Sequence, residues 1–182
     1  MDVIRGQYLD MDFETSEYIS VDQYLEMIRL KTSRLISGSI RIGALLVGVE
    51  DETDVLLEEI GEHAGLAFQI QDDYLGIWGD TSTTGKSNLT DLTTRKKTYP
   101  ILLGLAACPP FKAAWDANPN ITPELARGMA VMLAEAKADE RTKEEVQNHL
   151  RVIQGAEERL ASFGSNKSSG LWELLDSAFT PT

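Results

Sequence analysis

The sequence predicts an all-α protein. Apolar residues recur at helical spacing through most of the 182 residues, helix-start signals precede several of these stretches, and no convincing alternating strand is present. A chain of 182 residues with 42% apolar composition is long enough for one ordinary domain with its own core, so we expect residues 1–182 to form a single domain.

The first long helix is predicted over residues 21–47. Residues 3–9 look like the end of a preceding helix, and an acidic loop is expected to follow through Glu17. Ser20 and Gln23 then have the spacing of a capping box, in which each side chain accepts a hydrogen bond from the other residue's backbone N–H. The apolar positions of this helix form one stripe, which should face a core.

A second long helix is predicted to start from a cap at Thr53 and to run to Trp78. The segment that follows it, about residues 79–94, is expected to be a loop. Pro100 suits the first turn of a short apolar helix that ends near Cys108, because proline lacks the backbone N–H that is unsatisfied in a first turn.

The last third of the chain is predicted to contain further amphipathic helices. Residues 111–120 are expected to be a short surface segment. Thr122 and Thr142 are expected to cap two helices, and Gly164 to close the second of them. A final helix is predicted around residues 171–175.

Composition excludes several classes of function. A net charge of −12 and a pI near 4.6 argue against non-specific nucleic-acid binding, so a phosphorylated ligand should be small and held through metal. The single cysteine, Cys108, excludes an internal disulfide and favours a reducing compartment. The first thirty residues are acidic and contain neither a signal peptide nor a membrane anchor, so we expect a cytoplasmic protein.

The second long helix carries the residues with the clearest chemical meaning. Asp72 and Asp73 are separated by about 100° around the helix axis, and Gln69 lies one turn earlier on the same side. Mg²⁺ commonly takes only one or two protein carboxylates, so this pair suffices for a metal that arrives with its substrate. The alternative is a solvated acidic patch, which the apolar neighbours Phe68 and Ile70 disfavour because they would desolvate unpaired charges.

The basic residues and the histidines are ambiguous by themselves. Lys86, on a glycine-containing loop, could meet a phosphate or could be an ordinary solvated lysine, and Lys31 alone would be a surface charge. His63 and His149 have no partner at metal-ligand spacing, so we expect structural or surface roles for both.

These residues, taken together, closely resemble the region around the second aspartate-rich motif of the trans-isoprenyl diphosphate synthases, the polyprenyl synthetase family. The resemblance extends over about residues 4–104. It rests on Gly6-Gln7, Asp10, Tyr24-Leu25, Met27-Ile28, Lys31-Thr32, the run Phe68-Gln69-Ile70-Gln71-Asp72-Asp73-Tyr74-Leu75, Gly79-Asp80, Gly85-Lys86, Asp91-Leu92, Lys96 and Pro100.

The resemblance implies an isoprenoid synthase-type bundle of long helices around an apolar cavity, usually dimeric. It also implies a Mg²⁺-dependent prenyltransferase that condenses isopentenyl diphosphate with an allylic diphosphate. Carried over residue by residue, Asp72 and Asp73 would bind Mg²⁺, Lys31 and Lys86 would bind the allylic diphosphate, and Gln69 would orient the site. Thr32, beside Lys31, and Lys96, which matches a later family lysine, are further candidates for substrate binding.

Two departures from the family pattern are visible. The second motif commonly reads Asp-Asp-x-x-Asp, whereas Gly76 stands at its last position here, and Asp80 could substitute only through water or a bent helix. The first aspartate-rich motif is absent, together with its helix. The chain therefore looks like the carboxyl-terminal part of such a bundle, lacking its amino-terminal helices, and should expose apolar helix faces to a second copy or to a complementary synthase subunit.

We therefore expect a prenyltransferase of isoprenoid biosynthesis whose chain supplies the second metal site and could be inactive alone. The main alternative is a non-catalytic helical partner subunit, or a remnant, of a prenyl synthase. A third hypothesis is ionisation without chain elongation, as in the related terpene cyclases, but Lys31, Lys86 and Pro100 match the elongating branch better.

Overall fold

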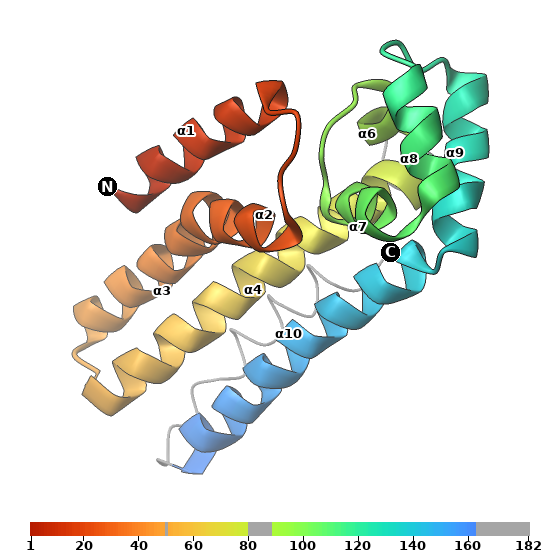
Figure 1. Ribbon diagram of the computed structural model, residues 1–182. Helices are drawn as coiled ribbons and strands as arrows, with labels where there is room; N and C mark the ends of the chain where they lie inside the picture. The colour runs from red at the N-terminus through yellow and green to blue at the C-terminus, as the bar shows by residue number, and fades with distance from the viewer. Residues whose placement is uncertain (50, 80–88, 163–182) are drawn as a thin grey trace. The chain divides into compact units, whose positions relative to one another are not determined.

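The computed structural model describes residues 1–49, 51–79 and 89–162, and every regular element in these ranges is helical, which confirms the predicted all-α class (Figure 1). The elements are α1 (Asp2–Thr15), α2 (Val21–Ile28), η1 (Arg29–Ser33), α3 (Arg34–Val47), α4 (Asp51–Trp78), α6 (Thr90–Thr93), α7 (Tyr99–Ala107), α8 (Pro109–Ala117), α9 (Pro123–Glu135) and α10 (Ala138–Ser162). Gly164 and the helix predicted around residues 171–175 lie outside the described residues. No helix in the described ranges is both long and apolar enough to cross a membrane.

The chain forms two compact units, and α1, α2, α4 and α10 each contribute residues to both. Unit 1 comprises residues 1–10, 25–69 and 146–182, and unit 2 comprises residues 11–24 and 70–145. We describe each unit by itself, and the single domain expected for residues 1–182 stays a prediction.

The first two helices only partly match their predicted bounds. Residues 10–15 continue α1, so the acidic loop expected from residue 10 is wrong as far as residue 15. Phe13 explains the extension, because its side chain is only 9% exposed and anchors the last turn of α1. The capping box is confirmed: the Ser20 amide donates to Gln23 Oε1 at 2.9 Å, and the Gln23 amide donates to Ser20 Oγ at 3.1 Å.

The predicted helix over residues 21–47 is one helical path interrupted by a π-helical turn. The turn, η1, separates α2 from α3 and contains Lys31 and Thr32. A π turn accommodates an extra residue within an α-helix and is common at functional sites. The path ends at Gly48, whose positive φ of 68° closes α3 in the left-handed conformation that glycine adopts without strain.

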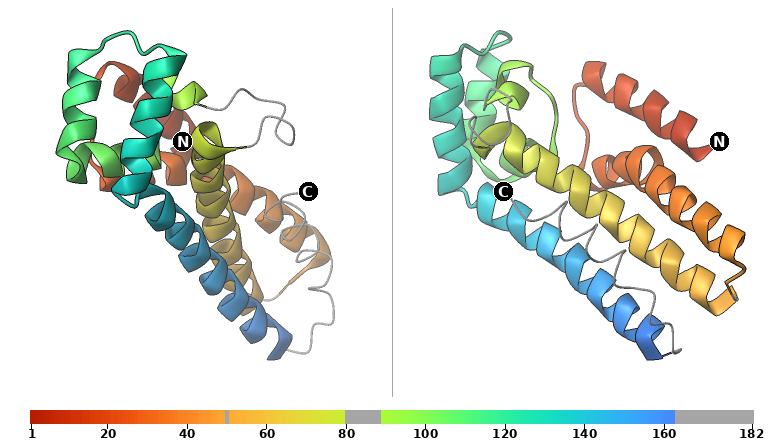
Figure 2. Two further views of the ribbon diagram at one scale, coloured as in Figure 1. Left: turned by 90° about the vertical axis from the view of Figure 1, so that its right-hand side faces the viewer. Right: turned by 180° about the vertical axis from the view of Figure 1, so that it is seen from behind.

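In unit 1, α4 runs between α3 and α10, and the views of Figures 1 and 2 agree that the three helices lie side by side. The α4 side facing α10 contributes Leu56, Ile60 and Ala64 to a buried apolar cluster. The α10 residues of the cluster are Ile153, Ala156 and Leu160. Because all six side chains are nearly inaccessible, this cluster provides the hydrophobic stabilisation that joins the two longest helices.

The opposite side of α4 approaches η1 and α3 unusually closely. A Cβ placed on Gly65 would lie 2.7 Å from the Ser33 Oγ and 2.9 Å from the Ser33 Cβ, and Gly61 has the same relation to Ser37. Ser33 and Ser37 are buried, with exposed fractions of 0% and 2%. The backbones can approach this closely only because small residues stand on both sides of the crossing.

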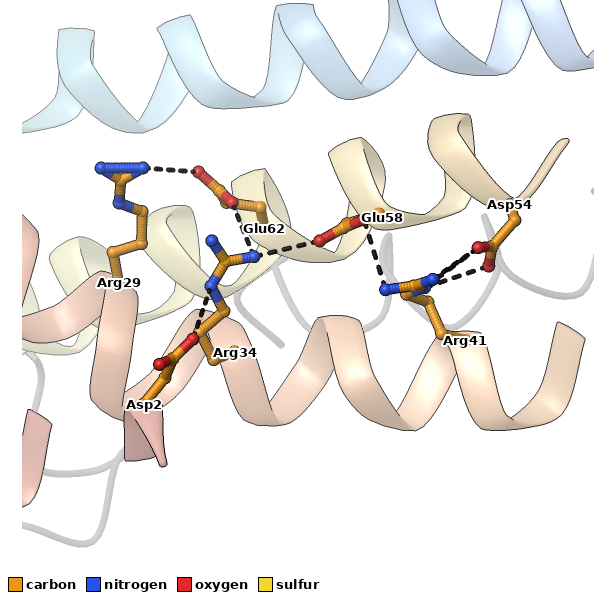
Figure 3. Close-up of polar contacts among 7 residues, drawn as sticks. All are labelled: Asp2, Arg29, Arg34, Arg41, Asp54, Glu58 and Glu62. Atoms are coloured by element: carbon orange, nitrogen blue, oxygen red, sulfur yellow. Dashed lines mark hydrogen bonds and ion pairs between the residues drawn. The ribbon is translucent and has the colours of Figure 1, made fainter. Parts of the chain in front are cut away.

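Ion pairs border this crossing (Figure 3). The three arginines Arg29, Arg34 and Arg41 face the acidic residues Asp54, Glu58 and Glu62, which recur every four positions along α4, and Asp2 of α1 joins the network. The shortest contact joins Arg41 Nη2 to Asp54 Oδ2 at 2.7 Å. All of these side chains are partly exposed, so each pair contributes little, but together they fix the register of the two helices.

Two other helix starts were predicted incorrectly. Helix α4 begins at Asp51, so Thr53 lies inside its first turn and is not the cap. Helix α10 begins at Ala138, so Thr142 lies inside this helix, where its buried hydroxyl donates to the Ala138 carbonyl at 2.6 Å. A threonine is also compatible with the helix interior, where its hydroxyl can bond to the carbonyl four residues earlier, so neither Thr53 nor the Thr142-x-x-Glu145 spacing identifies a helix start by itself.

Unit 2 is built around α7, α8 and α9. Helix α7 confirms the predicted apolar helix, which has Pro100 in its first turn and ends near Cys108. The predicted cap at Thr122 is also confirmed, because its side chain accepts a hydrogen bond from the Leu125 amide at 3.3 Å at the start of α9. The surface segment expected over residues 111–120 is wrong: α8 buries Phe111 (0% exposed) and Trp115 (5%). These two aromatic side chains recur at i and i+4, a helical spacing that places both on one face.

We predict that Gly65→Ala destabilises the protein by about 1–3 kcal/mol, because the added methyl group must displace Ser33 in a packed interior. The matched control is Gly43→Ala on the exposed side of α3, where an added Cβ meets no described atom within 4 Å. Alanine there should stabilise the helix by about 0.5–1 kcal/mol. Urea unfolding followed by circular dichroism measures both, and equal effects of the two substitutions would contradict the close crossing.

Candidate functional site

Asp73 is the most buried charged residue of the candidate site. Its exposed fraction is 1%, and its Oδ2 accepts hydrogen bonds from the Tyr24 hydroxyl and, at 3.0 Å, from the Tyr99 amide. The Tyr99 amide belongs to the first turn of α7, where backbone N–H groups have no partner within the helix. Asp73 therefore links the end of α4 to the beginnings of α2 and α7, and its negative charge is favourable at the α7 N-terminus.

Asp72, the other member of the pair, is only partly buried. Since consecutive helical residues project about 100° apart, Asp72 points away from the direction that Asp73 takes into the interior of unit 2. The two carboxylates, treated as equivalent in the sequence, therefore have different surroundings.

Gly76, one turn after Asp72, is covered by a carboxylate from elsewhere in the chain. A Cβ placed on Gly76 would lie 2.7 Å from Cγ of Asp91 and 3.1 Å from its Oδ1, with Oδ2 closer still. Asp91 lies on the short helix α6, and the buried Leu92 (0% exposed) anchors that helix. Sequence reasoning did not include Asp91 among the site residues; the available signal was its place in the Asp91-Leu92 pair of the resembling region.

The predicted diphosphate-binding residues are divided between the two units. In unit 1, the Lys31 ammonium forms an ion pair with Asp10, and the Thr32 hydroxyl donates to Gln69 Oε1 at 3.3 Å. Both contacts are partly buried. The π turn thus brings Thr32 to Gln69, which the sequence placed 37 positions apart.

In unit 2, Lys96 is exposed and stands in the loop before α7. Its amide donates to the Asp91 carbonyl at 2.9 Å, so Lys96 and Asp91 belong to one local structure. Lys86, Gly85 and Asp80 lie outside the described residues, and their predicted roles stay predictions.

Two other groups near the start of α7 have shifted pKa values. Burial is the main cause that raises the pKa of Tyr99 to about 12, with Glu145 as the second cause, so this hydroxyl stays neutral at any physiological pH. Burial also lowers the pKa of Lys97, whose ammonium donates to the Phe13 carbonyl at 2.9 Å. The contact between Lys97 and the Phe13 carbonyl joins the loop before α7 to the end of α1 within unit 2.

The histidines were described incorrectly from the sequence. His63 and His149 are not solitary: their Nδ1 atoms lie 2.8 Å apart, and their ring centroids lie 5.0 Å apart. The pair forms where α4 packs against α10, between positions 86 residues apart, which local spacing cannot reveal. The expectation of a structural role remains compatible with this contact.

Among the described residues, the donor chemistry around Asp72 suits a magnesium ion and does not suit a zinc ion. In the described ranges, no group of three or more His, Cys, Asp or Glu residues is arranged to hold a metal ion. Zinc requires such a group, whereas Mg²⁺ uses one or two protein carboxylates and completes its shell with water and phosphate oxygens. The adjacent carboxylates of Asp72 and Asp73 at the end of α4 have the donor chemistry that such a Mg²⁺ site requires.

The chain is similar in sequence to known prenyl diphosphate synthases. A sequence model described as polyprenyl synthetase matches residues 1–119. Among curated proteins, the chain is 45% identical over 100 residues to a geranylfarnesyl diphosphate synthase of Aeropyrum pernix, covering 55% of this chain and 31% of that protein. It is 41% identical over 105 residues to a geranylgeranyl diphosphate synthase of Mycobacterium tuberculosis, covering 58% of this chain and 30% of that protein.

Solved structures show the same relationship. A geranylgeranyl pyrophosphate synthase has a TM-score of 0.82 at 31% identity, with 97% of this chain and 55% of that chain covered. A geranylgeranyl pyrophosphate synthase of Corynebacterium glutamicum, complexed with isoprenyl diphosphate and magnesium, has a TM-score of 0.80 at 26% identity, covering 86% and 46%. The chain thus spans about a third of the length of the curated relatives that it matches and about half of these structures.

We predict that Tyr24→Phe lowers the free energy of unfolding by about 1.5–3 kcal/mol, because it removes a hydrogen bond to a buried carboxylate. Tyr18→Phe is the control, since the Tyr18 side chain is 74% exposed, and should change stability by less than about 0.5 kcal/mol. Urea denaturation monitored by fluorescence measures both variants. A Tyr24→Phe protein as stable as the Tyr18→Phe protein would show that the Asp73 carboxylate does not depend on this hydroxyl.

Proposed function

Because the chain belongs to the polyprenyl synthetase family, we propose that it serves Mg²⁺-dependent prenyl transfer, the condensation of isopentenyl diphosphate with an allylic diphosphate, by supplying the second metal site. The observation that carries this proposal is the carboxylate pair of α4, in which Asp73 is locked by two hydrogen bonds beside the more accessible Asp72. We also propose that the protein acts in the cytoplasm. Its single cysteine agrees with this location, because disulfides are rare in reducing compartments.

The two aspartates would contribute differently to metal binding. Asp72 is partly exposed and can offer its carboxylate directly. Asp73 Oδ2 already accepts two hydrogen bonds, so a metal contact from Asp73 would use Oδ1. A bound Mg²⁺ would supply positive charge that favours departure of the allylic diphosphate.

The remaining residues would recognise the diphosphate. Lys31 would bind a phosphate oxygen, and its ion pair with Asp10 would hold the ammonium in place before the substrate arrives. Thr32 and Gln69, which are already hydrogen bonded to each other, would orient the site. Lys96 and Lys86 would add positive charge beside the leaving group, and fixed charges of this kind need little reorganisation during the reaction.

A complete prenyl transfer needs more than these residues. The 182 residues contain no Asp-Asp-x-x-Asp motif, so the first metal site would have to come from another polypeptide segment. A surface suited to such a contact exists on α3, where Leu35, Ile42, Leu45 and Leu46 are 60–83% exposed. Apolar side chains gathered on one helix in this way favour burial against a second copy or a complementary synthase chain.

The same α3 surface supports a second candidate function, a non-catalytic helical partner subunit. Such a subunit would bind a full-length synthase through its apolar surface and would not need the aspartates. Replacing Asp72 and Asp73 by Asn would then leave its effect on the partner unchanged.

We predict that the purified chain binds an unreactive thio analogue of an allylic diphosphate only with Mg²⁺. Asp72→Asn should weaken this binding by about tenfold or more, because it removes a metal ligand. Asp22→Asn, on the exposed first turn of α2, is the control with the same chemical change and should bind normally. Isothermal titration calorimetry with and without Mg²⁺ measures the affinities. Absence of Mg²⁺-dependent binding in folded protein would reject the metal site and favour the partner subunit.

A further inference from the structure

We propose that Arg95 is a positioning residue for Lys96, which it holds in an exposed position by clamping the neighbouring backbone to the end of α8. This inference rests on the proposed function, because Lys96 is there assigned to the diphosphate. All the residues concerned belong to unit 2.

The first observation is the backbone conformation of Arg95. Its φ of 57° lies in the left-handed region, which is unfavourable for a residue with a side chain. The Arg95 amide donates to the Leu92 carbonyl at 3.1 Å. The Lys96 amide donates to the Asp91 carbonyl at 2.9 Å. These two bonds form a Schellman motif at the end of α6, where glycine is the usual residue in the position of Arg95. An arginine there must be held by contacts that offset its backbone strain.

The second observation is the set of contacts that hold the Arg95 side chain. Its Nη1 donates to the Trp115 carbonyl at 2.8 Å and to the Asn118 carbonyl at 2.6 Å. The guanidinium carbon lies 4.3 Å from the centroid of the Trp115 ring, a cation–π contact. A cation is favourable at the end of a helix, because the last carbonyls have no partner within the helix. Arg95 is therefore bound to the end of α8, and Trp115, which is only 5% exposed, fixes this attachment.

The third observation is that the residue on the other side of Lys96 is also anchored. The Lys97 ammonium donates to the Phe13 carbonyl at 2.9 Å and to the Glu14 carbonyl at 3.3 Å, both in the last turn of α1. Lys96, between these two anchors, is exposed. Of three consecutive basic residues, the outer two thus bind backbone carbonyls of the protein, and the middle one is presented to solvent.

This arrangement prepares Lys96 for an anionic ligand. A lysine on a short loop loses conformational freedom when it binds a ligand, and this loss weakens binding. Because Arg95 and Lys97 fix the backbone on both sides, only the Lys96 side chain remains to be ordered. Three adjacent basic residues also attract anions to this loop in a chain whose net charge is −12. A diphosphate is an anion that an exposed ammonium on an ordered backbone suits.

The test uses the full chain with four substitutions: Arg95→Gly, Arg95→Lys, Lys96→Met and the double variant Arg95→Gly/Lys96→Met. Glycine suits the left-handed conformation, so Arg95→Gly keeps the turn and removes only the clamp. Arg127→Ala, which removes the same charge from an exposed position on α9, is the control.

Two quantities are measured for each variant. Nuclear magnetic resonance follows the exchange of the Lys96 amide with deuterium, which needs no ligand. Isothermal titration calorimetry measures the binding of an unreactive thio analogue of an allylic diphosphate with Mg²⁺. Circular dichroism establishes that each variant is folded.

We expect Arg95→Gly to speed exchange of the Lys96 amide by about tenfold, because the hydrogen bonds from a charged group to two carbonyls are lost. The same variant should weaken binding of the analogue by about threefold to tenfold, since the ligand must then order the loop. Lys96→Met should weaken binding by about tenfold. The double variant should bind no more weakly than Lys96→Met, because Arg95 acts only through Lys96. Arg95→Lys should keep part of the affinity, because an ammonium can still donate to the helix end.

Each other outcome decides the inference. Unchanged exchange of the Lys96 amide in Arg95→Gly would overturn it. Losses of affinity that add in the double variant would also overturn it, because Arg95 would then act independently of Lys96. An effect of Arg127→Ala as large as that of Arg95→Gly would do the same, since net charge alone would explain both.

The exchange measurement separates this inference from the proposed function. If the unsubstituted chain binds no analogue, the proposed function is rejected and the exchange rates alone decide the inference. Faster exchange of the Lys96 amide in Arg95→Gly would then support the clamp, and unchanged exchange would overturn it.

Discussion

Unit 2 depends on the burial of one negative charge, the Asp73 carboxylate. A carboxylate that is 1% exposed would be strongly destabilising without partners, because the protein interior solvates charge poorly. The Tyr24 hydroxyl and the Tyr99 amide satisfy Oδ2, so three separate segments must meet at this point. Asp73 also serves the first turn of α7, which has no side-chain cap of its own. The position of Asp72 relative to α7 follows from this arrangement, since the two aspartates are adjacent on one rigid helix.

Close approach to α4 is the second constraint, and glycine permits it in each unit. At Gly65 the neighbour is the small buried residue Ser33, so the approach serves packing. At Gly76 the neighbour is the carboxylate of Asp91, which belongs to the short helix α6. The two glycines of α4 therefore have different surroundings: a small serine approaches Gly65, and a carboxylate approaches Gly76.

The family match and the contacts of the candidate site fall in the same part of the chain. The family match covers residues 1–119, a range that includes Asp10, the π turn with Lys31 and Thr32, both aspartates of α4, and Asp91. Residues beyond this range contribute packing, through α9 and through the α10 side chains that cover Leu56 and Ile60. The large apolar side chains of α3 stay exposed, because no other described residue of unit 1 covers them.

The sequence by itself determined the helical class, the capping box of Ser20 and Gln23, the helix containing Pro100 and the aspartate pair, because these signals are local: periodicity, capping and turn chemistry act within a few residues. It was misleading at Thr53, Thr142 and residues 111–120, where a local pattern fits two structures equally well. Only the tertiary structure paired His63 with His149, buried Asp73 beside Tyr24, and brought Asp91 to Gly76. These contacts join residues far apart in the chain, and their geometry depends on how whole helices pack, which no short stretch of sequence encodes.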